Sequence, residues 1–372
     1  MTDLFRDTDI YLSKLFYKIS GVFFALPLKI NLPEKEFYGG LIGCGEFVKY
    51  AYIPALNKLD SSITISSIYS RTAGNAKEAS KRFRYKSIIF DSFKEFMDSN
   101  IKAVIVTSPN HLHYEHVKEA IGHGMDVLCE KPLCNDLDDI LSLKTILDRS
   151  NSVLMVEFPL RYSSLLKGLS FLLRSRAIGD VETVEMFYKQ SVGESFLKSD
   201  WKNDSARSGG GVVHNAAIHL INVVLHLFGD VENVCSTLQN RYLPVSFGED
   251  TAHCEFIFKS GMRGTLNASY IVGGRDFSSQ LLIRGTEGNL KCVFWENDIS
   301  IERTAKKPYT VFHSNEIVPD VISIGIEHFY NCIKLRTKPM TDIEDSIRTM
   351  RVIKAIYTSH AEGGKICIDT SS

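Results

Sequence analysis

The feature that most constrains the fold is an alternation of short apolar strands and helices between residues 38 and 158. Strands are expected at 38–42, 63–69, 87–89, 103–107, 126–129 and 153–157. Helical patterns lie between them, ending at Ala55 and covering 73–83, 92–97, 114–123 and 137–148. Because single helices separate the strands, the strands should pair in parallel with right-handed crossovers. We therefore expect an α/β domain with a doubly wound parallel sheet at 38–158.

The pattern changes after Pro159. Strand runs follow one another with only short turns between them, at 181–188, 231–240, 251–258, 263–270, 280–285 and 289–294. Such runs indicate a large mixed, mainly antiparallel sheet. Helices are expected at 163–174, 212–228, 323–335 and 343–362. We interpret 159–372 as an α+β domain for substrate binding and oligomerisation, whose last helix packs back on the first domain.

Residues 1–37 form an N-terminal extension that we expect to be helical. The segment 10–28 is aromatic and aliphatic but is interrupted by Lys14 and Lys18, and the chain starts with acidic residues such as Asp3. A secretory signal has a basic start and an unbroken apolar stretch. A helix packed on the body or on a second subunit fits better, and a helix lying on a membrane surface stays open.

Composition narrows the classes of function. Of the residues, 44% are hydrophobic and 23% are charged. The net charge is -1, so we expect no strong positive electrostatic potential over the whole protein that would attract nucleic acid. No apolar run reaches the roughly 18–20 residues of a membrane span. The eight cysteines form no C-x-x-C motif, which is typical of free thiols in a reducing compartment. We expect a cytoplasmic protein.

The turn Gly43-Cys44-Gly45 follows the first expected strand and opens a helix. Such a turn lets backbone N–H groups approach a pyrophosphate, whose charge the helix N-terminus favours. The third glycine of the fingerprint is replaced by Val48, so the surrounding strand–helix series carries much of the inference. We predict a Rossmann domain that binds a dinucleotide at Gly43 and Gly45, with Glu46 and Phe47 following in the site.

The end of the second strand bears on the choice of cofactor. An acidic residue there would bind the ribose of NAD, but the sequence has Ser70 and Arg71. A hydroxyl and a guanidinium suit a 2′-phosphate, which favours NADP(H) somewhat within an NAD(P) cofactor. The alternative, that Arg71 stacks on the adenine and accepts either cofactor, stays open.

Several motifs occur in order and resemble the Gfo/Idh/MocA oxidoreductases, which include glucose–fructose oxidoreductase and inositol dehydrogenase. They are Thr107-Ser108-Pro109-Asn110-His111-Leu112-His113, Glu130-Lys131-Pro132, the pair Arg161-Tyr162, and Gly209-Gly210-Gly211 before a helix with His219. The resemblance runs from about residue 38 to the C-terminus. It implies an enzyme that transfers a hydride between NAD(P) and a sugar, sugar nucleotide or cyclic polyol.

In that family the lysine of E-K-P lies between nicotinamide and substrate, and here it is Lys131. This lysine also stands at the carboxyl end of a parallel strand, where an ammonium stabilises negative charge or relays a proton. The bond before the proline is commonly cis in the family. The resemblance further implies cofactor contacts from Thr107, Ser108, Pro109, Asn110, His113 and Glu130.

The second catalytic element of the family is an Asp-x-x-x-His pair, matched here by Asn215 and His219, which share one helical face. His219 can act as an acid or base near neutral pH. The amide of Asn215 can bind a hydroxyl but cannot relay a proton or favour a charged His219. A non-catalytic NAD(P)-binding sensor, or a reductase of a non-sugar C=O or C=N group, therefore stays open.

Further positions complete the expected site. Tyr188 is a candidate catalytic tyrosine, and Arg161 and Lys189 are candidate substrate contacts, with a packing role open for each. The cluster of His111, His113, His116 and His123 has no acidic or cysteine partner at zinc spacing, so no metal is expected. We expect a homodimer or homotetramer formed through the C-terminal sheet.

Overall fold

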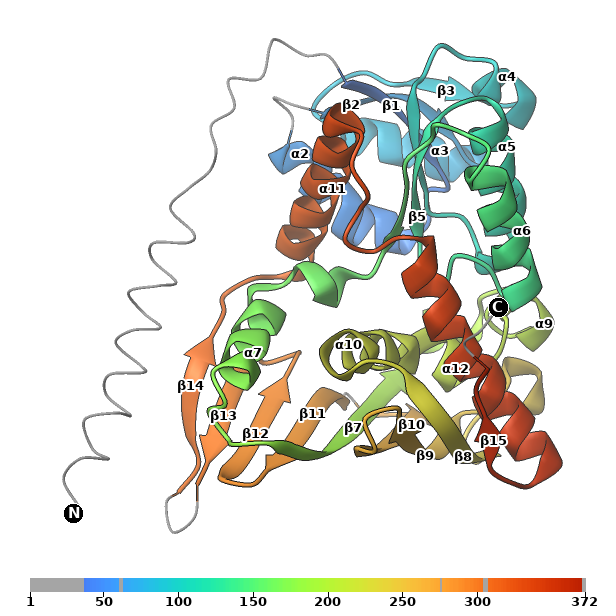
Figure 1. Cartoon of the computed structure of the whole chain (residues 1–372). Coiled ribbons are helices and arrows are strands. Elements are labelled where there is room, and N and C mark those ends of the chain that lie inside the picture. Colours follow the sequence, from blue (N-terminus) through green and yellow to red (C-terminus); the bar gives the residue numbers. More distant parts are fainter. Residues whose placement is uncertain (1–36, 60–62, 275, 304–306, 370–372) are drawn as a thin grey trace. The chain divides into compact units, whose positions relative to one another are not determined.

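The first sheet contains six parallel strands in the order β3-β2-β1-β4-β5-β6 (Figure 1). A computed structural model describes residues 37–59, 63–274, 276–303 and 307–369, so the expected extension lies outside the described residues except for Phe37. The strands are β1 (Phe37–Ile42), β2 (Ile63–Tyr69), β3 (Ile88–Phe90), β4 (Ala103–Val106), β5 (Asp126–Glu130) and β6 (Leu154–Glu157). The expected doubly wound parallel sheet is confirmed.

Helices lie on both faces of this sheet. They are η1 (Val48–Tyr52), α2 (Ile53–Lys58), α3 (Ala73–Arg82), α4 (Phe93–Met97), η2 (Asn110–Leu112), α5 (His113–Gly122) and α6 (Leu137–Leu147). The face that carries η1 and α2 is also covered by α11 (Val318–Leu335), from the far end of the chain. Ile322, Ile326 and Phe329 of α11 are buried in one cluster with residues of β1 and β2.

The second sheet has nine strands in the order β14-β13-β12-β11-β7-β10-β9-β8-β15. They are β7 (Val181–Val192), β8 (Val231–Gln239), β9 (Thr251–Phe258), β10 (Arg263–Val272), β11 (Phe277–Gly285), β12 (Gly288–Val293), β13 (Asp298–Glu302), β14 (Tyr309–His313) and β15 (Ile366–Cys367). β7 and β10 pair in parallel, and the other neighbouring pairs are antiparallel. This confirms the mixed sheet, although our sequence analysis missed β13, β14 and β15.

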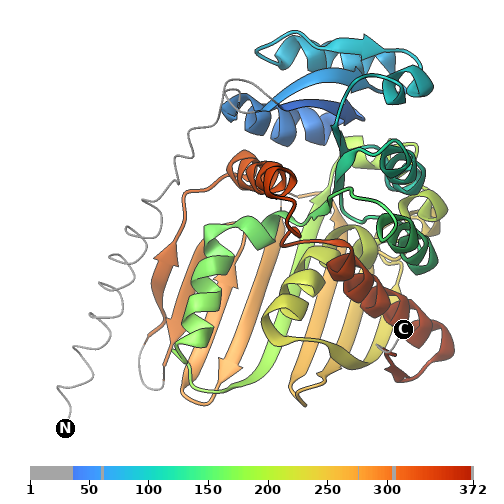
Figure 2. The same ribbon diagram turned by 45° about the horizontal axis from the view of Figure 1, so that its top comes forward.

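Helices α7 (Ser164–Arg174), α10 (Ile218–Phe228) and α12 (Ile343–Glu362) lie over one face of this sheet (Figure 2). Strand residues that alternate toward them, such as Val184 and Met186, are buried. Helix α12 contacts α6 as well as β8, so the last helix touches the first domain. The remaining short helices are η3 (Pro159–Tyr162), α8 (Glu194–Leu197), α9 (Ser205–Ser208), η4 (Val213–Ala217) and η5 (Val245–Phe247).

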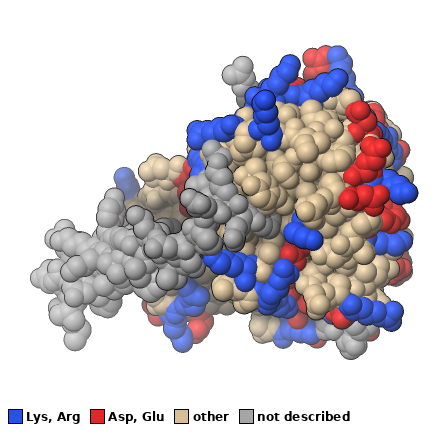
Figure 3. Space-filling model, turned by 90° about the horizontal axis from the view of Figure 1, so that it is seen from above, with Lys and Arg blue, Asp and Glu red and all other residues tan. Residues whose placement is uncertain are grey.

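One helical stretch, Ser205–Phe228, is long and apolar enough by composition to cross a membrane. Its most apolar window is 72% buried inside the fold, as expected for the core helix of a domain. On the face seen from the first domain, basic and acidic side chains surround a broad area without charge (Figure 3).

Candidate functional site

A cavity of about 510 Å³ opens where β1, β4 and β5 end and extends to the inner face of the second sheet. The turn after β1 contributes Gly45 to its wall, the turn after β4 contributes Thr107, and the end of β5 contributes Lys131. The carboxyl ends of parallel strands are where α/β sheets bind ligands. The cavity also receives Asn215 and His219 from the second domain.

The glycine turn fits a dinucleotide. Gly43 has φ +90°, and a β-carbon there would lie 2.7 Å from the backbone of Thr107 and Ser108, so a side chain is excluded. A β-carbon at Gly45 would meet nothing within 4 Å, which leaves room beside the turn. The helix that starts at Glu46 has first-turn N–H groups without intrahelical partners. Together these features match a pyrophosphate-binding turn.

The loop after β4 joins the two domains. Thr107 Oγ1 lies 2.9 Å from the carbonyl oxygen of Ile42 and 3.0 Å from that of Gly43, which ties the loop to the glycine turn. Asn110 Nδ2 donates to Asn215 Oδ1 at 2.9 Å and to the Ser208 carbonyl at 3.1 Å. The first domain therefore fixes the position of the Asn215 side chain.

His113 is buried between the two cofactor segments. Its Nδ1 lies 2.7 Å from the carbonyl oxygen of Pro132 and its Nε2 lies 2.7 Å from that of Ser108. Burial lowers the pKa of His113, and these two carbonyl acceptors oppose that shift. The imidazole ring of His113 therefore links the turn at Pro132 to the loop after β4. It also forms part of the cavity wall.

Lys131 projects into the cavity, and its Nζ donates to the backbone oxygen of Asn215 at 2.8 Å. Burial lowers the pKa of Lys131 to about 8, with Glu130 opposing the shift and Lys202 adding to it. The Glu130 carboxylate accepts from Tyr52 Oη at 2.6 Å and from the Lys131 backbone N–H at 3.2 Å. The bond between Lys131 and Pro132 is cis.

The glycine run before η4 explains why an amide stands at position 215. Gly209 and Gly210 have φ of +83° and +144°. Asn215 Nδ2 donates to the carbonyl of Gly210 at 2.6 Å and to that of Gly211 at 3.1 Å. A carboxylate has no hydrogen to donate and would face both oxygens. The amide therefore makes two hydrogen bonds here that a carboxylate could not make.

Glu249, which our sequence analysis missed, anchors the same helix. Its carboxylate accepts from the backbone N–H of Gly211 at 3.0 Å and of Val213 at 2.9 Å, and from the hydroxyl of Tyr357. It thereby satisfies donors at the start of η4. No spacing motif in the sequence indicates this contact, because Glu249 lies more than thirty residues after the glycine run.

His219 lies on the cavity wall, four residues after Asn215. Within the described residues its Nδ1 is buried and has no hydrogen-bond partner. Burial, and secondarily the charge of Lys131, lowers the pKa of His219 well below its usual range. The imidazole is therefore neutral at physiological pH, and its ring lies on the wall of the cavity.

Aromatic residues form much of the remaining wall, and the sequence analysis missed all of them except Phe47 and Tyr188. Tyr188 is buried and its hydroxyl donates to Gln190 Oε1 at 2.6 Å. Both tryptophans of the chain face this cavity. The aromatic set is Phe47, Tyr188, Phe196, Trp201, Phe247, Tyr270, Phe277, Phe294 and Trp295. The set comes from several separate segments, so no periodicity reveals it.

Two expected substrate contacts lie outside the cavity wall. Arg161 is buried, and its guanidinium donates to Asp345 Oδ1 at 3.0 Å and to the carbonyl of Met340 at 3.3 Å. Lys189 points away from the neighbouring Tyr188 and pairs with Asp276 at 3.0 Å near the surface. Both side chains already have structural partners, so the packing role left open for each fits their surroundings.

Some expected cofactor residues also lie beyond the cavity wall. Glu46 is exposed and pairs with Lys49 at 2.9 Å. Arg71 follows Ser70 at the end of β2, and its Nη2 lies 3.6 Å from the Asp200 carboxylate. Pro109 begins the turn at η2.

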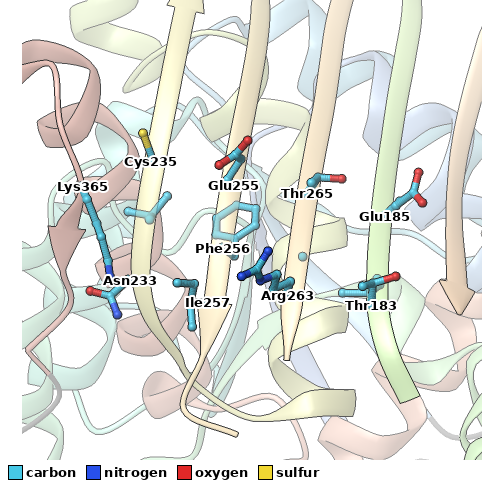
Figure 4. Close-up of a pocket in the computed structure, with 13 residues that line it drawn as sticks. Thr183, Glu185, Asn233, Cys235, Glu255, Phe256, Ile257, Arg263, Thr265 and Lys365 are labelled. Carbon is cyan, nitrogen blue, oxygen red and sulfur yellow. The ribbon is translucent and has the colours of Figure 1, made fainter. Parts of the chain in front are cut away.

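A second cavity of about 560 Å³ lies on the large sheet and shares no lining residue with the first (Figure 4). It lies on the face of the sheet opposite α7 and α10, and its lining residues include Thr183, Glu185, Glu255, Arg263 and Thr265. Within the part of the chain that the structure describes, no group of three His, Cys, Asp or Glu side chains is placed to hold a metal ion.

The strand order, the glycine turn and Lys131 at the end of β5 define a dinucleotide-binding oxidoreductase. Residues 37–158 match the oxidoreductase family with an NAD-binding Rossmann fold, and residues 169–291 match the GFO/IDH/MocA C-terminal domain. The chain belongs to the Gfo/Idh/MocA oxidoreductase family, as the sequence motifs predicted.

Relatives and solved structures agree with this assignment. Oxidoreductase P35 of Formosa agariphila is 25% identical over 279 residues, which is 73% of this chain and 83% of that protein. D-apiose dehydrogenase of Paraburkholderia graminis is 25% identical over 347 residues, 88% and 89% of the two chains. A levoglucosan dehydrogenase, solved with NADH and levoglucosan, shares the fold with a TM-score of 0.82 at 20% identity, covering 90% of this chain and all of that one.

Proposed function

We propose that this oxidoreductase transfers a hydride between NAD(P) and a CH–OH carbon of a sugar, sugar nucleotide or cyclic polyol. The observation that carries the proposal is the placement of Lys131 and His219 on the wall of one cavity beside the glycine turn. Relatives named for sugar or polyol substrates support it, among them the D-apiose dehydrogenase and a scyllo-inositol 2-dehydrogenase of Bacillus subtilis.

The nicotinamide, when bound, supplies the hydride chemistry. The ammonium of Lys131, oriented by the Asn215 carbonyl, hydrogen-bonds the substrate oxygen and stabilises negative charge on it. The neutral His219 accepts the hydroxyl proton during oxidation and returns it during reduction. The Asn215 side chain is held by Asn110 and the glycine run, and its Oδ1, which accepts from Asn110, has a second lone pair that can accept from a substrate hydroxyl.

The rival function is a non-catalytic NAD(P)-binding sensor. Its main support was the asparagine at position 215, where the family has aspartate. The hydrogen bonds from Asn215 to Gly210 and Gly211 give that residue a structural reason, so it need not mark a lost activity. An enzyme is therefore the better-supported function.

The choice of cofactor follows from Arg71. We infer NADP(H) as the somewhat favoured form, because a guanidinium at the end of β2 suits a 2′-phosphate. Asp200 already lies beside this guanidinium, and its carboxylate would compete with the phosphate. The preference for NADP(H) over NAD(H) should therefore be modest.

Turnover tests the proposal. The nicotinamide absorbance is followed with a panel of polyols, sugars and sugar nucleotides, using wild type, Lys131→Met and the matched surface control Lys189→Met. Lys131→Met should lower turnover by roughly 10²–10⁴-fold, the scale of a positioned acid or base, with cofactor affinity retained. Normal turnover by Lys131→Met would remove the proposed role, and cofactor binding without turnover across the whole panel would favour the sensor.

Assembly is a separate proposal. We propose a cytoplasmic homo-oligomer formed through the face of the large sheet opposite α7 and α10. That face carries a cavity with both acidic and basic side chains, Glu185 and Arg263 among them, which can complement a second copy (Figure 4). Light scattering measures the mass, and a monomer at micromolar concentration would contradict the proposal.

A further inference from the structure

Lys202 is a second lysine on the wall of the catalytic cavity. It follows Trp201 in the segment between α8 and α9. Its Nζ lies 5.3 Å from the ring centroid of Phe196 and 5.5 Å from that of Trp201. No carboxylate pairs with this ammonium in the part of the chain that is described. The two ring faces hold the cation but do not cancel its charge.

The charges around the cavity do not balance. Lys131 and Lys202 each bring a positive charge, whereas Glu130 is the carboxylate on the wall and already accepts from Tyr52 and from the backbone of Lys131. Burial lowers the pKa of Lys202, and Lys202 in turn lowers the pKa of Lys131. Cations shielded from water without a counter-charge are unfavourable, so a ligand that brings a negative charge is favoured here.

The position of Lys202 indicates which ligand brings that charge. Phe196, which the Lys202 ammonium faces, stacks on Phe247 with centroids 5.9 Å apart and contacts Tyr270 at 5.3 Å. Tyr270 belongs to β10 of the large sheet, so this ammonium lies at the second-domain side of the cavity. The glycine turn that suits the cofactor pyrophosphate lies in the first domain, after β1. The anion should therefore belong to the substrate.

We propose that Lys202 forms an anion subsite, and that the substrate is a sugar-like polyol bearing one carboxylate or phosphate group. The ammonium of Lys202 binds the anion, while the adjacent rings of Trp201 and Phe196 contact the apolar face of the sugar ring. The hydroxyl that reacts is then directed toward Lys131 and His219. This inference rests on the proposed function and makes its substrate class more specific.

Binding to the cofactor-loaded protein tests the subsite without requiring turnover. Because both tryptophans line the cavity, intrinsic tryptophan fluorescence reports its occupancy. The probes are matched pairs that differ in one charged group: D-glucose with D-glucuronate, D-galactose with D-galacturonate, and D-glucose with D-glucose 6-phosphate. In at least one pair the anion should bind roughly 10–100-fold more tightly than its neutral partner, the usual effect of a hydrogen bond to a charged group.

The variants assign that preference to Lys202. Lys202→Met should abolish it, and Lys202→Arg should retain most of it. Lys198→Met is the matched control, because Lys198 is exposed and pairs with Glu194 four residues earlier. Calorimetric titration of each variant with NADH separates the cofactor from the substrate, and NADH affinity should stay within a few-fold of wild type.

Three outcomes overturn the inference. The anion and neutral partners bind equally in every pair, including the case in which neither binds. Alternatively, the preference survives in Lys202→Met. Finally, Lys202→Met weakens NADH as much as the sugar acid, which would assign the lysine to the cofactor pyrophosphate. Turnover with neutral sugars alone would leave the proposed function standing while rejecting the anion subsite.

Discussion

Replacing Asn215 by aspartate removes the donor that faces the carbonyl oxygens of Gly210 and Gly211. Its Nδ2 now donates to the carbonyls of Gly210 and Gly211 at 2.6 and 3.1 Å. In Asn215→Asp a carboxylate oxygen faces those two oxygens, and the hydrogen bond from Asn110 is the contact that remains. Both glycine carbonyls lose the amide donor and meet a like charge, although the Ser208 hydroxyl still donates to Gly210 and the Asn215 backbone N–H still donates to Gly211.

The size of the effect follows from these contacts. Each lost hydrogen bond costs about 0.5–1.5 kcal/mol, and more where a buried acceptor stays unsatisfied. For two bonds we expect the free energy of unfolding to fall by roughly 1–3 kcal/mol, and the Tm by roughly 1–4 °C. The assay is urea and thermal unfolding of wild type, Asn215→Asp and Asn215→Ala.

Asn215→Ala is the control that separates lost hydrogen bonds from added repulsion. It leaves the same carbonyls without the amide but brings no charge, so it should destabilise less than Asn215→Asp. If Asn215→Asp proves as stable as wild type, the orientation of the amide toward the glycine run is wrong. The structural reason offered for the asparagine would then fall, and the sensor would regain its support.

Three further predictions follow from the site. Because burial lowers the pKa of Lys131 to about 8 and its ammonium is the form that stabilises the substrate oxygen, kcat/KM should fall in both directions as pH increases through about 8, with this limb absent in Lys131→Met; a limb that persists in this variant would belong to another group. Arg161→Met breaks the buried pair with Asp345 and should cost about 3–5 kcal/mol in urea unfolding while KM stays unchanged, whereas a raised KM at full stability would restore a substrate contact. Asp200→Asn frees Arg71 and should tighten NADPH binding several-fold relative to NADH in calorimetry, and an unchanged ratio would show that this pair does not contact the ribose region.

The fold was predictable where the sequence pattern is local. Strands β2 and β9 and helix α12 have the predicted bounds, because their apolar patterns begin and end at clear turns or caps. Strands β13 and β14 were missed, since each has five residues and the segment that holds them lacks long apolar runs. The parallel pairing of β7 with β10 joins strands about eighty residues apart, and no local signal specifies it.

The site was predictable only where a residue's role depends on its neighbours in sequence. The glycine turn and the E-K-P strand end are local motifs, and both line the first cavity through Gly45 and Lys131. The pairing of Arg161 with Asp345 gives no local signal, because the two residues lie 184 positions apart. Lys202 was missed for the converse reason, since a lysine in a polar loop gives no sign that folding will bring aromatic rings around it.

The contribution of α11 to the first domain has a consequence for how the protein is made. The first sheet is translated early, but the cluster on one of its faces is completed by Ile322, Ile326 and Phe329. A nascent chain must therefore carry that apolar face uncovered until nearly the whole sequence has left the ribosome. Contacts between such distant segments slow folding and expose the intermediate to aggregation. Residues 37–158 expressed alone should accordingly be poorly soluble, and adding the α11 segment in trans should improve their recovery.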